Sequence, residues 1–377
     1  MSSIKSISLQ NFRNHLSFRK IISTDKKYII IQGKNGVGKT SILESISLFS
    51  NGNGLHQVPL HSISKHNSIQ PFGVNISMRN KSEDIFSELS MSLVNGNRII
   101  KEDNNKTTFK LVESKFCVMW ITPHLDHFFR ESNSQQLNFI QIFIAKWDTN
   151  FKDILSRYTS LIEERRSVLL LQKFDNNKKS SPSDYSDWLD GIECQLVPIA
   201  TEIAQINRLY CKEINKVLLE DGFIFPLKLE CTGLLESKLE TKKASLVEEE
   251  YGLYLKKNRF LVENRHKIDG PHKSKIILTN SSNNLPGSLC STGEKRLLMI
   301  SFIMSNAKLF EDRFNFLPIL LWDDVLSYLD ESYRVSFCRW LDFFDTQHWL
   351  TTTDSQFFKD KFSKEEGDII SLTPQQF

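Results

Sequence analysis

A glycine-rich loop that ends in a lysine and a threonine carries the clearest chemical signal in the sequence. The loop has the spacing Gly-x-x-x-x-Gly-Lys-Thr and closely follows four consecutive apolar residues, Tyr28–Ile31. Glycines permit the tight turn in which successive backbone N–H groups point at one anion. This pattern is typical of a phosphate-binding loop, and it predicts that the chain binds a nucleoside triphosphate. The residues predicted to contact the nucleotide are Gly33, Lys34, Asn35, Gly36, Val37, Gly38, Lys39, Thr40 and Ser41.

The last two residues of the pattern have separate predicted roles. The ammonium group of Lys39 can reach the β- and γ-phosphates as a catalytic cation, and the hydroxyl of Thr40 can coordinate Mg²⁺. An ordinary glycine-rich turn is the alternative, but the flanking sequence disfavours it. Apolar residues recur at helical spacing over Ser41–Phe49, so the loop is predicted to join a strand to the positive end of a helix dipole. ATP and Mg²⁺ are therefore the expected cofactors.

Two adjacent carboxylates supply the second part of the predicted site. Asp323 and Asp324 end an apolar stretch, Phe316–Trp322, that is typical of a buried strand. Asp323 is predicted to hold Mg²⁺ from the strand tip beside the phosphate loop. Asp324 would point to the other side of the strand and accept a proton from the attacking water as the general base. Solvated acids at a strand end are the alternative, which a phosphate loop in the same chain disfavours.

A short polar motif opens a strongly apolar helix in the last third of the chain. Ser291 is a plausible N-cap and Glu294 completes a capping box, which by itself would explain the motif. In ATPases of the ABC type, however, a Ser-x-Gly helix start binds the γ-phosphate held on a second subunit. The order of the motifs along this chain matches that type. The residues predicted to contact the ATP of a partner copy are Ser291, Thr292, Gly293 and Glu294.

Four more positions belong to the predicted site. Ser327, Leu329 and Asp330 follow the acidic pair and match the D-loop of these ATPases. Arg13 follows the first predicted strand, where its guanidinium can reach the nucleotide phosphates.

Composition and the spacing of apolar residues predict an α/β protein in three parts. The hydrophobic fraction of 40% and the charged fraction of 25% are typical of a globular protein. The net charge of +3 neither requires nor excludes a polyanionic partner. Residues 1–124 and 255–377 alternate strands with helices and are predicted to form the two parts of an ATPase head. Residues 125–254 have helical spacing, with two long helices joined by a polar loop at 174–183, and are predicted to form an arm.

The cysteines and the apolar stretches bear on the compartment. Six scattered cysteines without C-x-x-C spacing indicate buried free thiols rather than a disulfide frame or a zinc site. Since we find no apolar stretch of membrane-spanning length and no signal peptide, we expect a cytoplasmic protein without a membrane partner.

These motifs give the sequence a specific family resemblance: it resembles the RecF family, in the SMC/Rad50-like branch of ABC ATPases. The resemblance rests on motifs that span almost the whole chain in the family's order, namely Leu9–Asn14, Gly33–Thr40, Trp120–Pro123, Gly270–His272, Ser291–Arg296, Leu321–Asp330 and Thr351–Asp354. It implies an ABC-type head with an inserted all-helical arm. It also implies ATP-dependent homodimerisation on single-stranded or gapped duplex DNA, with slow ATP hydrolysis used as a switch. The implied role is recombinational repair, replication-gap processing and SOS induction, in which the protein helps to load recombinase with RecO and RecR.

Three alternatives remain at this stage. A transporter ATPase subunit has a much shorter interval than the about 250 residues between phosphate loop and signature here, and the position of its switch histidine is Thr353. A phosphate-loop kinase needs no Ser-x-Gly helix start from a second subunit. A nucleotide binder with little hydrolysis is disfavoured because Lys39, Thr40 and both carboxylates are present.

Overall fold

The computed structural model describes residues 3–50, 52, 54–56, 58–59, 62–64, 71–79, 86–94, 97–174, 182–219, 227–259, 268–362 and 365–373. The chain forms two compact units. Within the described ranges, unit 1 comprises residues 1–126 and 299–377, and unit 2 comprises residues 127–220 and 224–298.

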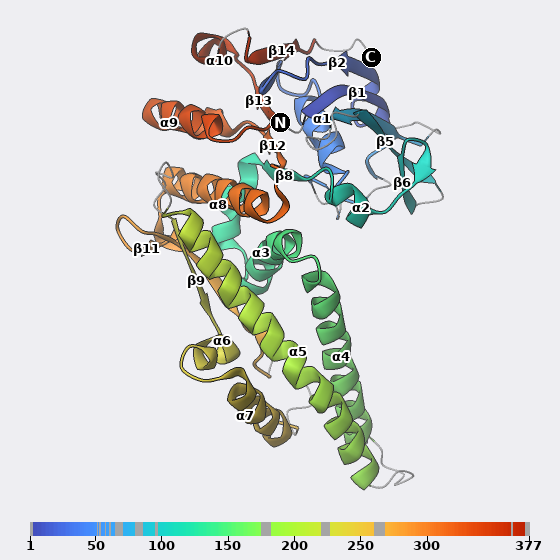
Figure 1. The fold of residues 1–377 in the computed structure, drawn as a ribbon, viewed down its shortest axis with the longest axis vertical. Helices are drawn as coiled ribbons and strands as arrows, with labels where there is room; N and C mark the ends of the chain where they lie inside the picture. Colours follow the sequence, from blue (N-terminus) through green and yellow to red (C-terminus); the bar gives the residue numbers. More distant parts are fainter. Residues whose placement is uncertain are drawn as a thin grey trace. The chain divides into compact units, whose positions relative to one another are not determined.

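Unit 1 contains a five-stranded parallel sheet with the strand order β14-β3-β13-β12-β8 (Figure 1). Its strands are β3 (Tyr28–Gln32), β8 (Val118–Ile121), β12 (Ile319–Trp322), β13 (His348–Thr352) and β14 (Gly367–Ser371). The three central strands are almost fully buried, which explains the continuous apolar runs of β3 and β12. Because every pairing is parallel, the carboxyl ends of the strands meet at one edge of the sheet. The segments after β3 and β12 therefore lie near each other, with the end of β13 between them.

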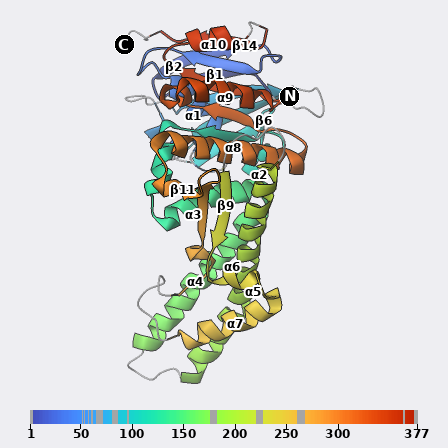
Figure 2. The same ribbon diagram turned by 90° about the vertical axis from the view of Figure 1, so that its left-hand side faces the viewer.

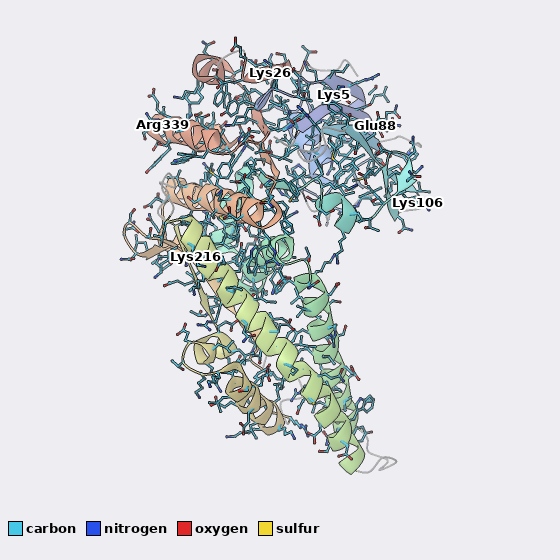
Figure 3. The ribbon with its side chains drawn as sticks, in the orientation of Figure 1. Lys5, Lys26, Glu88, Lys106, Lys216 and Arg339 are labelled. Atoms are coloured by element: carbon cyan, nitrogen blue, oxygen red, sulfur yellow. The ribbon has the colours of Figure 1, made fainter. Side chains whose placement is uncertain are left out.

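A six-stranded antiparallel sheet with the order β2-β1-β4-β5-β6-β7 completes the β-structure of unit 1. One hydrophobic core joins both sheets and helix α1, with Ile7, Ile31 and Ile42 as members from the three parts. Burying each isoleucine stabilises the fold by about 2 kcal/mol. On this sheet the ammonium of Lys5 lies 4.2 Å from the ring centroid of Phe86 (Lys5 is labelled in Figure 3). The elements are β1 (Ser3–Phe12), β2 (His15–Ile21), β4 (Gly73–Arg79), β5 (Phe86–Val94), β6 (Asn97–Glu102), β7 (Asn105–Lys106) and α1 (Lys39–Ser47).

The remaining elements of unit 1 are helical. They are α2 (Phe109–Glu113), η6 (Val325–Tyr328), α9 (Glu331–Asp342) and α10 (Gln356–Lys361), and α8 (Thr292–Phe314) has residues in both units. Among the helices in the described part of the chain, none is both long and apolar enough to cross a membrane.

Unit 2 is built on a pair of long helices, α4 and α5, which lie side by side and antiparallel (Figures 1 and 2). Buried Arg165 of α4 donates to Glu193 of α5 at 2.8 Å, and it also donates to the carbonyl oxygen of Leu255 in α7 at 2.9 Å. The two predicted arm helices are confirmed, and most of the polar loop predicted between them lies outside the described residues. The helices are η2 (Pro123–Arg130), α3 (Asn133–Trp147), α4 (Phe151–Phe174), α5 (Pro182–Val217), α6 (Leu234–Leu239), α7 (Ala244–Lys257), η4 (Pro271–Lys273) and η5 (Gly287–Leu289).

A small antiparallel sheet with the order β11-β10-β9 also lies in unit 2. Its strands are β9 (Leu227–Thr232), β10 (Lys275–Asn280) and β11 (Leu285–Pro286). The α/β fold class is confirmed, but β9 lies inside the predicted arm, which is therefore not purely helical. The sequence pattern missed this strand because it is short and pairs with β10, some forty residues later in the chain. The three-part domain division itself stays a prediction.

The cysteines follow the predicted pattern only in part. All six are free, and Cys117, Cys211, Cys290 and Cys338 are buried. Cys194 is exposed and Cys231 is half-buried, so the expectation that all six thiols are buried is wrong for these two.

His348 lies fully buried in β13, against the ring of Tyr28. Its Nδ1 accepts a hydrogen bond from the indole of Trp322 at 3.3 Å, and its Nε2 lies 3.1 Å from the carbonyl oxygen of Leu341. One accepting and one donating nitrogen define a neutral imidazole. Burial, together with the cation of Lys27, lowers the pKa of His348 to about 3.

We therefore expect His348 to make the fold sensitive to acid. Below pH 6.5 the unfolded chain takes up a proton at this residue and the folded protein does not, so stability falls as the pH falls. Between pH 7 and pH 5.5 the loss from this residue is about 1.3 kcal/mol. Urea unfolding of His348→Gln at both pH values should lack this share of the loss. His56→Gln, at an exposed histidine, should keep it, and an equal pH dependence in all three proteins would contradict the expectation.

Candidate nucleotide-binding site

The predicted phosphate loop connects β3 to α1, as the sequence indicates. Gly36 and Gly38 have φ values of 87° and 95°, in the left-handed region that favours glycine. A Cβ atom on Gly33 would lie 2.8 Å from the side chain of Val37, so close packing also requires a glycine there. Because α1 begins at Lys39, its first backbone N–H groups have no partner within the helix. The loop and the helix start thus form a concentration of N–H donors suited to an anion.

Lys39 lies across this loop with its side chain largely buried. Its ammonium donates to the carbonyl oxygens of Gly33 at 2.7 Å and Lys34 at 3.0 Å. Burial lowers the pKa of Lys39, and the nearby carboxylates of Asp324 and Asp323 oppose that shift. The cation is therefore held beside the backbone donors, where phosphate oxygens can replace the two carbonyls.

Thr40 and Asp323 come together from opposite ends of the chain. The Thr40 hydroxyl lies 2.9 Å from Oδ1 and 3.1 Å from Oδ2 of Asp323, whose side chain also accepts from Thr351 at 2.7 Å. A hydroxyl and a carboxylate about 3 Å apart match two neighbouring oxygen ligands of one Mg²⁺, which takes few protein ligands beside phosphate and water. The residues present therefore fit the metal that the sequence implies.

Electrostatics at Asp323 favour a cation at the same place. Burial raises the pKa of Asp323, while hydrogen bonds from Thr351 and Thr40 and the nearby His56 lower it. Ionising this carboxylate is therefore unfavourable without a compensating positive charge. A bound cation would supply that charge.

Asp324 differs from the expectation based on strand alternation. Because β12 ends at Trp322, Asp324 lies beyond the strand and has a left-handed backbone with φ 48°. Its N–H donates to the hydroxyl of Thr351 at 2.8 Å, and its carboxylate accepts a hydrogen bond from Ser327. A turn rather than the pleat of a strand orients the predicted general base.

Arg13 also lies in a left-handed turn, directly after β1. Its guanidinium makes a two-point contact with Glu44 of α1, at 2.8 Å from Nε and 2.6 Å from Nη2. Glu44 is 1% exposed, and a buried carboxylate needs such a partner. The contact of Arg13 with a nucleotide phosphate stays a prediction. It requires the guanidinium to break its hydrogen bonds to Glu44 or to bind the phosphate and Glu44 together.

Three residues that support the site were not predicted from the sequence. Asn14 donates to the carbonyl oxygen of Gly36 at 2.9 Å, and Nε2 of buried His15 lies 3.0 Å from that of Gly38. The turn between β1 and β2 thus braces the phosphate loop. Thr351, at the end of β13, bonds both acidic residues. Asn14 and Thr351 belong to motifs of the family resemblance, and His15 directly follows one. Their roles could not be read from the sequence, since the contacts join segments far apart in the chain.

The other predicted nucleotide contacts lie at the surface of the loop. Lys34 and Asn35 are exposed, and Val37 and Ser41 are half-buried. These side chains are accessible from solvent, as a ligand site requires.

The predicted capping box at the start of α8 is confirmed. The backbone N–H of Ser291 donates to Glu294 at 2.8 Å, and the N–H of Glu294 donates to the Ser291 hydroxyl at 3.3 Å. The side-chain amides of Asn280 and Asn283 add donors to the same carboxylate, and these bonds lower the pKa of Glu294. Ser291 and Thr292 are exposed. The proposed contact with a partner's nucleotide stays a prediction.

Of the predicted D-loop residues, Ser327 lies in η6, and Leu329 and Asp330 follow it. Leu329 is buried, and its carbonyl oxygen accepts from the guanidinium of Arg334 at 2.8 Å. Asp330 is exposed and directly precedes α9, and Ser327 is exposed beside Asp324. Leu329 therefore anchors a short segment whose polar members face solvent.

The parallel sheet, the phosphate loop after β3, the acidic pair after β12 and the capped Ser-x-Gly helix start define an ATPase head of the ABC type. The family model described as "RecF/RecN/SMC N terminal domain" matches residues 3–366. A protein of Rickettsia massiliae named "DNA replication and repair protein RecF" is 30% identical, with 93% of this chain and 94% of that protein covered. The chain therefore belongs to the RecF family.

Two further comparisons agree with this assignment. A protein of the same name from Agrobacterium fabrum is 25% identical over 94% of this chain and 93% of its own. A solved structure described as "the recombination mediator protein RecF-ATP in RecFOR pathway" has a TM-score of 0.79 at 22% identity. It covers 100% of this chain and 98% of that one, and it shares the fold. The transporter alternative is disfavoured.

The hydroxyl of Thr351 provides a sharp test of the site. Thr351→Val removes one donor to Asp323 and leaves the N–H of Asp324 without its acceptor. We expect the free energy of unfolding to fall by about 2 kcal/mol. We also expect ATP turnover to need more Mg²⁺ for half-maximal rate, because Asp323 is less well oriented. Urea unfolding and a Mg²⁺ titration measure the two effects.

Two variants control this experiment. Thr351→Ser keeps the hydroxyl and should restore both properties. Thr353→Val makes the same change at an exposed threonine two residues later and should alter neither. A Thr351→Val protein with wild-type stability and Mg²⁺ dependence would contradict the proposed role.

Proposed function

We propose that this chain is an ATP-dependent DNA-binding protein of DNA replication and recombinational repair. The observation that carries the proposal is the meeting of Lys39, Thr40 and Asp323 at the loop after β3. Membership of the RecF family supports the cellular role, since its curated relatives have the name "DNA replication and repair protein RecF". Nucleotide binding is the general claim of the proposal. The bound metal, the dimer and the protein partners are its more specific claims.

In this proposal the nucleotide phosphates occupy the N–H-rich loop. The start of α1 and the Lys39 ammonium neutralise their charge. The Thr40 hydroxyl and Asp323 would hold Mg²⁺, which would neutralise phosphate charge when bound. The buried position of Asp323 excludes bulk water from one side of that site.

Hydrolysis is slow in this proposal and serves to reset a switch. Asp324 accepts the proton of the attacking water, and Ser327 orients its carboxylate. We expect Asp324→Asn to keep ATP binding and to slow turnover by about 100-fold or more, since the amide cannot act as a base. The lifetime of the ATP-bound dimer should increase accordingly. Single-turnover hydrolysis and light scattering measure the two quantities.

A matched control exists for that variant. Ser327→Ala removes only the hydrogen bond to Asp324 and should slow turnover much less than Asp324→Asn. Near wild-type turnover in Asp324→Asn would assign the base to another residue.

The dimer follows from the helix start at Ser291. A phosphate loop already surrounds the nucleotide of its own subunit, so a second N–H-rich helix start has a use on the γ-phosphate of a partner copy. A Cβ atom on Gly293 would meet no described atom of this chain within 4 Å. Packing within the described chain therefore does not explain this glycine, and close approach of an external group would. The resulting interface is two-fold, with two ATP molecules between two copies.

Single-stranded or gapped duplex DNA is the proposed substrate of the ATP-bound dimer. The RecO and RecR proteins are the proposed partners in recombinase loading. The solved RecF-ATP structure that shares this fold is described as a recombination mediator of the RecFOR pathway, which supports this part of the proposal. Because the net charge is only +3, the DNA contacts must be local and should depend on salt.

The test is DNA binding with ATP, with ADP and without nucleotide, at two salt concentrations. Fluorescence anisotropy of a labelled gapped duplex reports the affinity. We expect tight DNA binding only in the presence of ATP. DNA binding should be weaker at higher salt in every condition. Equal affinity with ATP and ADP would overturn the proposal that ATP controls DNA binding.

A further inference from the structure

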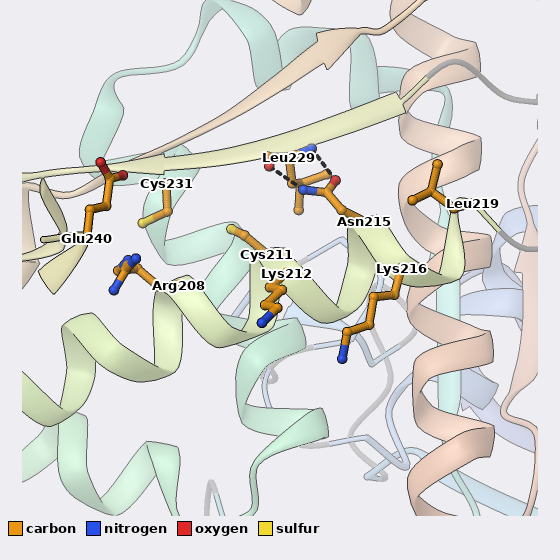
Figure 4. A pocket seen from close by; sticks show the side chains of 9 residues that line it. All are labelled: Arg208, Cys211, Lys212, Asn215, Lys216, Leu219, Leu229, Cys231 and Glu240. Carbon is orange, nitrogen blue, oxygen red and sulfur yellow. Dashed lines mark hydrogen bonds between the residues drawn. The ribbon is translucent and has the colours of Figure 1, made fainter.

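A pocket of about 400 Å³ lies in unit 2 between α5 and β9 (Figure 4). Two cysteines face each other across it, Cys211 from α5 and Cys231 from β9. The Cys211 thiol hydrogen-bonds that of Cys231 and raises its pKa. Cys211 is 4% exposed, and Cys231 is half-buried. Both cysteines line the pocket, and Cys231 is the more exposed of the two.

Basic side chains line the same pocket. Arg208, Lys212 and Lys216 lie at successive four-residue intervals on α5 and thus on one face of that helix. Glu240 is the acidic residue of the lining, and Lys216 pairs with Glu213 at 2.5 Å. Arg208 is close enough to the Cys231 thiol to oppose part of the rise in its pKa, and exposed Lys212 lines the same pocket. Such cations attract an anionic reactant.

We propose that Cys211 and Cys231 form a redox-active dithiol, which a carboxylate-bearing low-molecular-weight disulfide oxidises to an intramolecular disulfide. The other four cysteines lack this combination: Cys194 is exposed, Cys117 and Cys338 are buried in unit 1, and the thiol of buried Cys290 donates to the carbonyl oxygen of Leu285 at 3.8 Å. Disulfides in intracellular proteins are usually transient and redox-sensing, which fits a pair that is free in this structure.

The proposed reaction is two successive thiol–disulfide exchanges. The Cys231 thiolate attacks one sulfur of the small disulfide, whose S–S bond breaks, and a small thiolate leaves. The Cys211 thiolate then attacks the sulfur of Cys231, and the second small thiolate leaves. Two protons pass from the protein thiols to the departing thiolates and two electrons to the small disulfide. Burial and the thiol–thiol bond raise the pKa of Cys231, so the first exchange is slow at neutral pH.

The disulfide would connect α5 covalently to β9, two elements that already pack against each other. Asn215 of α5 bonds both the N–H and the carbonyl oxygen of Leu229, at 2.8 Å each, one helical turn from Cys211. These two bonds fix the backbone of α5 relative to β9 beside the pair.

The test uses the full-length chain with Cys194→Ser, which removes the exposed thiol. The protein is incubated with oxidised glutathione, and peptide mass spectrometry identifies the cross-links. We expect loss of two titratable thiols and a Cys211–Cys231 disulfide that dithiothreitol reverses. Adding Cys211→Ser should stop the reaction at a mixed disulfide on Cys231. Full retention of all thiols over several hours, or a cross-link between other cysteines, would overturn the proposal.

A charge variant tests the recognition of the oxidant. Lys212→Glu should slow oxidation by glutathione disulfide roughly fivefold, as expected for losing about 1 kcal/mol of attraction in water. The rate with the uncharged 2-hydroxyethyl disulfide should not change. Equal slowing by both oxidants, or no slowing by either, would contradict a role for the basic face of α5.

Discussion

Lys39→Ala is expected to weaken ATP binding by about two to four orders of magnitude. Two charge-assisted hydrogen bonds to the phosphates are lost, each contributing about 1.5–3 kcal/mol. In the described part of the chain this ammonium donates its hydrogen bonds to carbonyl oxygens of its own loop, so the fold should tolerate its removal. Equilibrium titration with a fluorescent ATP analogue measures the affinity, and light scattering reports ATP-driven association.

Lys34→Ala is the matched control. Lys34 lies in the same loop, but its side chain is exposed and only its carbonyl oxygen contacts Lys39. The control should bind ATP within a few-fold of wild type. Unchanged affinity and unchanged association in Lys39→Ala would refute the assignment of the loop as the nucleotide site.

Ser291→Arg is expected to abolish ATP-dependent dimerisation while each monomer still binds ATP. The arginine would fill the position that we assign to the partner's γ-phosphate. The phosphate loop, which lies in unit 1, is unaltered by this change in unit 2. Light scattering with ATP, ADP and no nucleotide should show dimers only for the wild type with ATP. The variant should also lose ATP-stimulated DNA binding and keep a weak, salt-sensitive contact.

Two controls separate this effect from loss of the helix cap. Ser282→Arg places the same side chain at an exposed position after β10 and should dimerise normally. Ser291→Asn keeps an N-cap acceptor without the bulk and should preserve the fold. A wild-type dimer without nucleotide, or a Ser291→Arg protein that dimerises with ATP, would leave Ser291 as a helix cap only.

The sequence by itself determined the class of site and the elements that hold it. Local sequence patterns were sufficient because these elements depend on residues that are close in the chain. The glycine spacing specifies the loop between β3 and α1, and an apolar run specifies the buried strand β12. The capping box at Ser291 and Glu294 needs only residues three apart. The pairing of Thr40 with Asp323 was also predictable, since both follow strands of one parallel sheet.

Only the tertiary structure decided how the predicted side chains are held. Thr351 bonds the carboxylate of Asp323 and the backbone N–H of Asp324 because β13 lies between β3 and β12, an order that the sequence does not state. Likewise the turn after β1 braces the phosphate loop, and Arg13 pairs with Glu44 before any nucleotide binds. The proposed redox pair brings together Cys211 of α5 and Cys231 of β9, a strand that lies within the predicted helical arm. Each of these contacts links residues that are distant in the chain. The local spacing of apolar residues does not predict which distant segments pack together.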